Sequence, residues 1–597
     1  MSKPFKFLKK HYLLVTSIVL LIAIGITLQV YGKSIVKQLL QQYIQRETAG
    51  NYELTYTDLD YNLLSRRVTL HQVALLPKGN VPFDRSSYSI ELKRMDVQLH
   101  EILSIYTENK LHIEGIDIIE PTVSLLSGLN AKDQITVDLG NLYLLISDYI
   151  EILEIDYFNL QSGTFIYKNT DAVFENIDFQ LKSFILDSID RPNEIFYADE
   201  IDLKLQKESF ILPDSTHSFN FDRFRLSTAD SILAFENVTI RPLENIQADS
   251  QTVYHIDIPL LELVGIDYHK AYHEDLLTLD SVKIESPEVD ILSGRKEQEG
   301  KLRDLLAKLF RSHLINVFVI NDGEVTYQKN SHKIKSTLNG NIYQLKLDST
   351  VLKKNSTWFS EIEANLRDFS YIFEDSSTIA TFDDLKASTF EQSLDIQNFD
   401  LNFNLNEKRN KLIFSSIDID GVDIMAYMRE GIIHASSIVL DEPVAGIGSE
   451  FGDPSSVTAS YSPDDIYRHI ASFASTIKAD NLQVMQADLS NANTRLSKID
   501  FTTQNFVLDS SVHRWSNITG RDQLSLHFAM TRGDFRIMGL ADYTETYQHI
   551  HISDPVIAHA QIDTLQAKAT AVYIYGLTLD DFLLNQYPIA DSVLLWS

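Results

Sequence analysis

Two pairs of histidines are the first residues of this sequence that could do chemistry. His549 and His551 lie two residues apart, so on a β-strand they share one face and could chelate zinc. No third ligand is recognisable near them, and a solvated polar strand face is the simpler interpretation. His269 and His273 lie four residues apart, on a segment that we expect to be a short helix. We therefore predict no metal site at either pair.

Two further groups resemble binding motifs but depart from their patterns. Asp418, Asp420, Gly421 and Asp423 suggest a calcium loop, yet the twelve-residue pattern with its final glutamate is missing, so we interpret them as the wet face of a strand. Three glycines after Pro443 miss the spacing of a dinucleotide-binding loop, and we expect an ordinary loop there. They are Gly446, Gly448 and Gly452.

Recognisable catalytic motifs are missing from the chain. It contains no phosphate-binding loop, nucleophile elbow or zinc-protease signature. We therefore predict no catalytic residues, no cofactor and a non-enzymatic function. An envelope hydrolase remains an alternative without a residue constellation to support it.

Composition excludes other classes of protein. The 597 residues exceed the size of one compact core, so several units or an elongated array are expected. The 52 basic and 83 acidic residues give a net charge of -31, which repels nucleic-acid phosphates. A hydrophobic share of 44% excludes a disordered acidic chain. The sequence has no cysteine, so it can form no disulfide.

The N-terminus predicts a membrane anchor. Residues 12–31 are an uncharged stretch of 20 residues, about the length that crosses a bilayer, and lysines precede it. By the positive-inside rule, residues 1–11 are a cytoplasmic basic tail and the body lies beyond the membrane. A cleaved signal peptide is the alternative, but the apolar run is long and lacks a small-x-small cleavage site.

Beyond an amphipathic helix predicted at residues 33–48, the dominant pattern is the period of two that is typical of strands with one apolar face. The residues between the apolar ones are mostly polar, so we predict mainly antiparallel sheets. Fourteen alternating apolar residues are the candidates for a lipid-binding face: Ile177, Phe179, Leu181, Ile201, Leu203, Leu205, Phe399, Leu401, Phe403, Leu405, Leu524, Leu526, Phe528 and Met530.

The sequence repeats itself with a period of about 155 to 166 residues. Residues 111–128 and 277–294 align without a gap, so Pro121 coincides with Pro287. A third copy begins at Ile432, and its Pro443 follows Gly421 by 22 residues, as Pro287 follows Gly265. Each copy continues with a predicted helix, at residues 139–153, 302–313 and 464–477, and then with a strand pair in which Gly163, Gly323 and Ala487 match.

A fourth copy starts near Lys568, with Gly576 in the place of Gly421. The expected proline falls one residue beyond Ser597. Because repeat arrays end in modified caps, we expect a longer natural protein. The predicted organisation is residues 32–88 as an N-terminal helix and first strands, followed by β-repeats at residues 89–253, 254–409 and 410–566 and a partial repeat at residues 567–597.

These features resemble the AsmA-like family of repeating β-groove envelope proteins of bacteria. The resemblance rests on the basic N-terminus with its single anchor, on residues 39–79, and on the unit around Pro121 and Pro287. It implies an elongated, curved, mostly antiparallel β-groove with about one amphipathic helix per repeat, anchored in the inner membrane and reaching through the periplasm. The third copy departs from the pattern after Pro443, which leaves the continuity of the groove there open.

We therefore expect a phospholipid-transfer or envelope-biogenesis protein whose partners are the inner membrane, through residues 12–31, phospholipid, and at the far end the outer membrane or its proteins. Two alternatives stay open on the sequence alone. The apolar faces could close into dry cores, or the chain could be a scaffold or assembly factor whose sheet edge pairs with outer-membrane proteins.

Overall fold

The computed structural model describes residues 52–62, 65–78, 87–101, 110–126, 151–167, 172–187, 198–212, 216–243, 252–274, 276–293, 312–348, 358–405, 408–446, 467, 471, 474–490, 494–511, 523–532, 535–544, 548–559, 562–576 and 590–596. The predicted anchor at residues 12–31 and the predicted helix at residues 33–48 lie outside these ranges. Within them, no helix is long and apolar enough to cross a bilayer.

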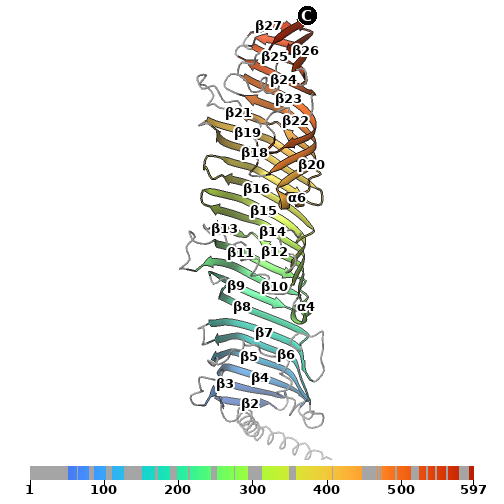
Figure 1. Cartoon of the computed structure of the whole chain (residues 1–597). Coiled ribbons are helices and arrows are strands. Elements are labelled where there is room, and N and C mark those ends of the chain that lie inside the picture. Colours follow the sequence, from blue (N-terminus) through green and yellow to red (C-terminus); the bar gives the residue numbers. More distant parts are fainter. Residues whose placement is uncertain are drawn as a thin grey trace, which may run out of the picture. The chain divides into compact units, whose positions relative to one another are not determined.

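The fold is mainly β, as the alternating pattern predicts. The described residues form strands of a long mixed sheet and two short helices, α4 (Tyr268–His273) and α6 (Ile424–Glu430) (Figure 1). The chain divides into two compact units. The first unit holds residues 1–211, 218–239 and 260–280, and the second holds residues 212–217, 240–259 and 281–597. The predicted groove and repeat boundaries stay predictions.

Strands of the first unit pair with their neighbours in chain order, most of them antiparallel, except that the first strand pairs with the third (Figure 1). They are β1 (Tyr52–Thr55), β2 (Asp58–Asn62), β3 (Arg67–Pro77), β4 (Ser87–Glu101), β5 (Lys110–Leu126), β6 (Ile152–Tyr167), β7 (Ala172–Leu186), β8 (Glu200–Ile211) and β9 (His217–Ser227). Four strands contribute residues to both units: β9, of which only His217 belongs to the second unit, and β10 (Ile232–Pro242), β11 (Val253–Val264) and β12 (Leu276–Glu285).

The second unit continues with longer hairpins. Its strands are β13 (Glu288–Ser293), β14 (Ser312–Lys329), β15 (His332–Asp348), β16 (Glu361–Ile372), β17 (Ile379–Ser388), β18 (Ser393–Leu405), β19 (Lys408–Asp420), β20 (Ile432–Asp441), β21 (Val444–Gly446), β22 (Thr476–Ser490), β23 (Thr494–Leu508), β24 (Gln523–Arg532), β25 (Phe535–Thr544), β26 (His549–His559), β27 (Ile562–Lys568), β28 (Ala571–Tyr575) and β29 (Ser592–Trp596).

Parallel pairs interrupt the antiparallel order at the same place in each sequence copy. They are β5 with β6, β13 with β14, and β20 and β21 with β22. Parallel neighbours need a crossover connection, often a helix, and the three predicted helices fall in these connections. Most of those residues lie outside the described ranges, although Ala471 N–H donates to Tyr467 O as in a helix. The predictions are wrong at their C-terminal ends, since β6, β14 and β22 begin there.

The matched prolines occupy equivalent positions at the parallel pairs. Glu324 N–H donates to Pro287 O at 2.7 Å, and Asp488 N–H donates to Pro443 O at 2.8 Å. The predicted match between these segments is therefore visible in their backbone contacts.

Three glycines recur at the end of a strand, each in the left-handed region. Gly265, Gly421 and Gly576 have φ values of +71°, +66° and +73°. A Cβ placed on Gly421 would lie 2.3 Å from Ser436 Oγ, and the side chains of Asp280 and Asp591 crowd the other two in the same way. Backbone conformation and space both require glycine here, which explains why the sequence repeats it.

We predict that Gly421→Ala destabilises the β19 and β20 pair by about 2 kcal/mol or more, because the added Cβ meets Ser436 in a backbone conformation that disfavours alanine. Gly431→Ala is the matched control, since Gly431 has a φ of +69° but its Cβ would meet nothing closer than Ser475 Oγ at 3.8 Å. Hydrogen exchange of the β19 and β20 amides measures both. Equal effects of the two variants would contradict the steric argument.

Candidate functional site: the apolar sheet face

A row of apolar residues crosses the first unit at facing positions of paired strands. Facing residues point to the same side of a sheet. The row passes through β2 to β9 as Leu59, Leu70, Met95, Ile118, Leu160, Phe179, Leu203 and Leu226. A second row runs beside it as Tyr61, Val68, Val97, Ile116, Phe158, Leu181 and Ile201. We call this side the apolar face of the first unit.

The second unit has an apolar row of its own, which is longer. It contains one residue from each of fifteen strands, in the order Tyr254, Ile291, Tyr327, Ile334, Tyr371, Ala380, Leu401, Leu412, Ala445, Leu489, Leu496, Met530, Ile537, Ile557 and Ala567. No polar residue interrupts it. The row passes through β21, so the departure of the third copy after Pro443 does not break it.

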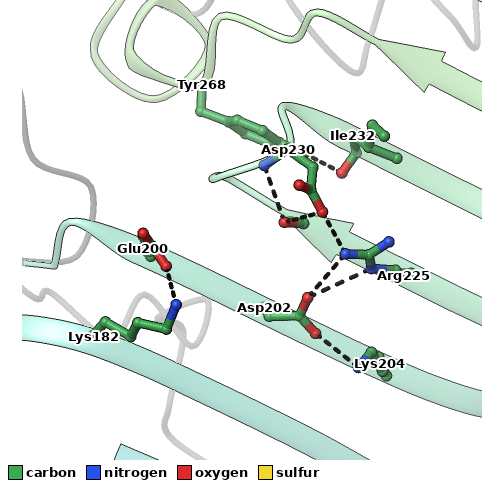
Figure 2. Close-up of polar contacts among 9 residues, drawn as sticks. Lys182, Glu200, Asp202, Lys204, Arg225, Asp230, Ile232 and Tyr268 are labelled. Atoms are coloured by element: carbon green, nitrogen blue, oxygen red, sulfur yellow. Dashed lines mark hydrogen bonds and ion pairs between the residues drawn. The ribbon is translucent and has the colours of Figure 1, made fainter. Parts of the chain in front are cut away.

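The other side of the first unit is polar. Its facing positions include Asp60, Thr69, Asp96, Asp117, Asn159, Gln180, Asp202 and Ser227. Neighbours in this row bond to one another, as where Asn159 Nδ2 donates to Asp117 Oδ1 at 3.0 Å. Figure 2 shows the end of this row, where Arg225 pairs with both Asp202 and Asp230 and Lys182 pairs with Glu200 at 2.5 Å. The sheet of this unit therefore has one apolar side and one polar side.

Residues with positive φ inside the strands shift the alternation by one position. In β18, Leu394 and Ile396 face apolar residues of β19 before Asn398, whose φ is +54°. After Asn398, Phe399 and Leu401 face apolar residues. An extra residue in the left-handed region lets a strand bend while its apolar side chains stay on one side.

Side chains of neighbouring strands satisfy the amides at several of these bends. Ser162 N–H donates to Asp178 Oδ1 at 2.9 Å, and Asp322 N–H donates to Asn339 Oδ1 at 2.7 Å. Gln486 N–H donates to Asp500 Oδ1 at 2.7 Å. Each of these amides, which the bend would leave unpaired, thus donates to a side chain of the neighbouring strand. The hydrogen bond offsets the cost of leaving an amide unpaired.

The predicted lipid-binding residues lie on the apolar faces of their own units. In the first unit, Phe179 faces Leu203 and Leu181 faces Ile201, with Ile177 on β7 and Leu205 on β8 as neighbours. In the second unit, Leu401 faces Leu412 and Phe399 faces Phe414. Phe403 faces Asn410, so the apolar alternation ends there.

The other candidates are placed by backbone alone, because their side chains lie outside the described ones. Leu405 ends β18, and Leu524, Leu526, Phe528 and Met530 lie on β24. Met530 faces Leu496 and Ile537 in the long row.

Sequence reasoning missed an aromatic cluster on the first apolar face. Phe235 contacts three rings at centroid distances of 4.9 to 5.6 Å, those of Phe224, Phe221 and Phe219. Residues 219–226 do alternate between apolar and polar types, which could have identified the cluster. The alternation shifts by one residue between Phe221 and Phe224, however. A strict period of two therefore did not select them.

Part of each apolar face is packed closed. In the second unit, Ile419, Ile438, Leu482, Ile550 and Val572 belong to one buried cluster, against which Ile424 of α6 packs. In the first unit, Leu59, Leu70, Val73 and Leu92 form a smaller buried cluster. These portions of the apolar faces therefore form closed hydrophobic cores. Other residues of the faces, such as Phe179, Leu203 and Tyr327, are only half-buried.

The motif-like residues take structural positions. His549 and His551 share a face as predicted, and they stack on Tyr575 and Tyr573 at 4.7 and 4.5 Å. Burial and the neighbouring His551 lower the pKa of His549. The other pair lies on α4, the predicted short helix. Among the described residues, no group of three or more histidines and acids could hold a metal ion.

Two interpretations of these motifs need correction. Asp418 and Asp420 lie on β19, but Asp423 is the N-cap of α6, where its carboxylate accepts from Ala426 N–H at 2.8 Å. Gly446 ends β21 rather than lying in a loop, because β21 pairs with β19 and β22 up to that residue. Gly448 and Gly452 lie outside the described residues.

Carboxylates gather where β18 meets the end of β19. Asp395 faces Asp418 directly, and Asp420 faces Ser393 beside them. Burial raises the pKa of Asp395, and the charges of Asp418 and Asp420 raise it further. These acids repel one another when ionised.

Comparison of the chain with protein-family models and with curated proteins finds no match.

We predict that Asp418→Asn stabilises the β18 and β19 pair by roughly 0.5 kcal/mol at pH 7. The raised pKa of Asp395 means that ionisation is less favourable in the folded state, so the penalty is present at neutral pH and disappears once the acids are protonated. The gain should therefore vanish near pH 3.

Asp400→Asn is the control on the same strand, because Asp400 pairs with Lys411 at 2.9 Å and its neutralisation removes an attraction. Hydrogen exchange of β18 and β19 at the two pH values measures both variants. A gain from Asp418→Asn that persists at pH 3 would refute the electrostatic origin.

Proposed function

We propose that this chain is a lipid-transfer or envelope-biogenesis protein that carries the acyl chains of phospholipids on its apolar sheet faces. The observation that carries the proposal is the unbroken apolar row within each unit, with half-buried members, opposite a polar side in the first unit. Such a row offers acyl chains a path along which no polar residue intervenes. The groove shape, the curvature and the continuity between units are part of the proposal.

The free-energy cost of exposing acyl chains to water favours transfer of a phospholipid along an apolar protein surface. A two-chain lipid in water exposes roughly 30 methylenes at about 0.8 kcal/mol each, a barrier on the order of 20 kcal/mol. An apolar strip removes most of that barrier wherever it stays continuous. The polar side would keep such a protein soluble while its other side holds lipid.

The resemblance to the AsmA-like family supports the same function and adds the location. We propose that residues 12–31 anchor the chain in a bacterial inner membrane, with the N-terminus in the cytoplasm and the body in the periplasm. The chain would act without catalysis and would deliver lipid towards the outer membrane.

We predict that Phe403→Asp lowers phospholipid transfer about tenfold or more, because a carboxylate beside acyl chains costs at least the about 1.4 kcal/mol that a tenfold change represents. Asn402→Asp is the control, since its exposed side chain alternates to the other side of the same strand. Transfer of a fluorescent phospholipid from vesicles that hold the full chain to acceptor vesicles measures both.

Binding itself is tested on the body after cleavage at a protease site engineered behind Lys33. Mass spectrometry of this body, purified without detergent, should find phospholipid. A lipid-free body would contradict the proposed function.

A further inference from the structure

Glu208 is a nearly buried carboxylate on the apolar face of the first unit. It lies on β8 opposite Phe221 of β9, and only 4% of its surface is exposed. Two residues further along the strand, Phe210 faces Phe219. A carboxylate in apolar surroundings is costly unless hydrogen bonds or a cation compensate its charge. Its presence on this side of the sheet therefore needs an explanation.

The protein compensates this carboxylate only in part. Glu208 Oε1 accepts from Glu175 N–H at 3.0 Å. Burial raises the pKa of Glu208, and the bond to the amide opposes this effect. Within the described part of the chain, no lysine or arginine forms an ion pair with Glu208. A cation from outside the chain would complete the compensation.

Phenylalanines on β7, β8 and β9 lie near this position, since Phe221 faces Glu208, Phe210 is two residues along its strand, and Phe174 precedes the residue whose amide it binds. The ring of Phe210 lies 5.7 Å from that of Phe174 and 6.1 Å from that of Phe221, measured between centroids. Ring faces attract cations, most strongly where water is excluded. Phe210 is 38% exposed, so a ligand can reach its ring.

We propose that Glu208, with the rings of Phe174, Phe210 and Phe221, binds the ammonium group of a zwitterionic phospholipid headgroup such as phosphatidylethanolamine. The inference rests on the proposed function and names the headgroup that the same face selects. The acyl chains would lie along the neighbouring rows through Leu203 and Leu205. A lipid with an anionic headgroup and no amine would meet the carboxylate with repulsion, so the site discriminates between the two classes.

The test uses the full chain with the photoreactive residue benzoylphenylalanine in place of Phe210. It is reconstituted in vesicles of equal parts phosphatidylethanolamine and phosphatidylglycerol, irradiated, and the cross-linked lipids are identified by mass spectrometry. We expect the ethanolamine lipid to exceed the glycerol lipid at least fivefold. Glu208→Gln should return that ratio to about one and leave total cross-linking unchanged, because the amide oxygen still accepts from Glu175 N–H.

Glu200→Gln is the matched control, since Glu200 lies on the polar side of the same strand, where it pairs with Lys182, and its neutralisation should leave the ratio unchanged. Equal ratios in the parent protein and in Glu208→Gln would overturn the headgroup inference and leave the proposed function standing. Absence of any cross-linked lipid in the parent protein would overturn the proposed function, and this inference with it.

Discussion

Register between neighbouring strands is the constraint on which the rest of this structure depends. A slip of one residue in any ladder would move the apolar residues of that strand to the polar side. The row from Tyr254 to Ala567 contains no polar residue through fourteen successive strand pairings. Bends at residues such as Asp322 preserve it, because the neighbouring strand supplies an acceptor for the amide that the bend frees.

The sequence predicted the strands more accurately than the faces. Period two located Phe399 and Leu401, and the recurring glycines, such as Gly421, mark equivalent turns. The period of two did not assign Leu394 and Ile396 to the same face as Phe399 and Leu401, because the alternation shifts by one residue at Asn398. Asparagine with a positive φ looks like any polar strand residue in a sequence. Phase changes of this kind depend on the neighbouring strand, which a single-strand pattern does not contain.

The predictions for the three crossover helices were wrong at their C-terminal ends for a related reason. Ile152 and Leu153 extend the apolar spacing of the preceding segment, so a helical period fits them, yet they face β5 as the first residues of β6. Short apolar runs satisfy both periods, and long-range pairing decides between them. Glu208 is a different case. Its residue type is plain in the sequence, but neither its burial nor its position opposite Phe221 on the next strand can be read there.

Side-chain size separates the closed and open parts of the apolar faces. The buried cluster of the second unit contains Ala435, Ala479 and Ala541, which let larger neighbours pack tightly against them. The first unit instead places phenylalanines on β8 and β9, of which Phe221 is buried and Phe210 is 38% exposed. A face of constant polarity can thus be a dry core in one portion and an accessible surface in another.

The parallel pairs set the order in which such a sheet can assemble. Lys329 and His332 pair across a two-residue turn, and such a short connection closes quickly. Lys110 pairs with Ile152, so β5 can gain its parallel neighbour only after the long connection between them has been synthesised. During synthesis, each completed group of hairpins therefore presents a bare strand edge until the whole crossover has emerged. These intervals are when intermolecular pairing competes with folding, so the slowest and most aggregation-prone moments recur once per crossover.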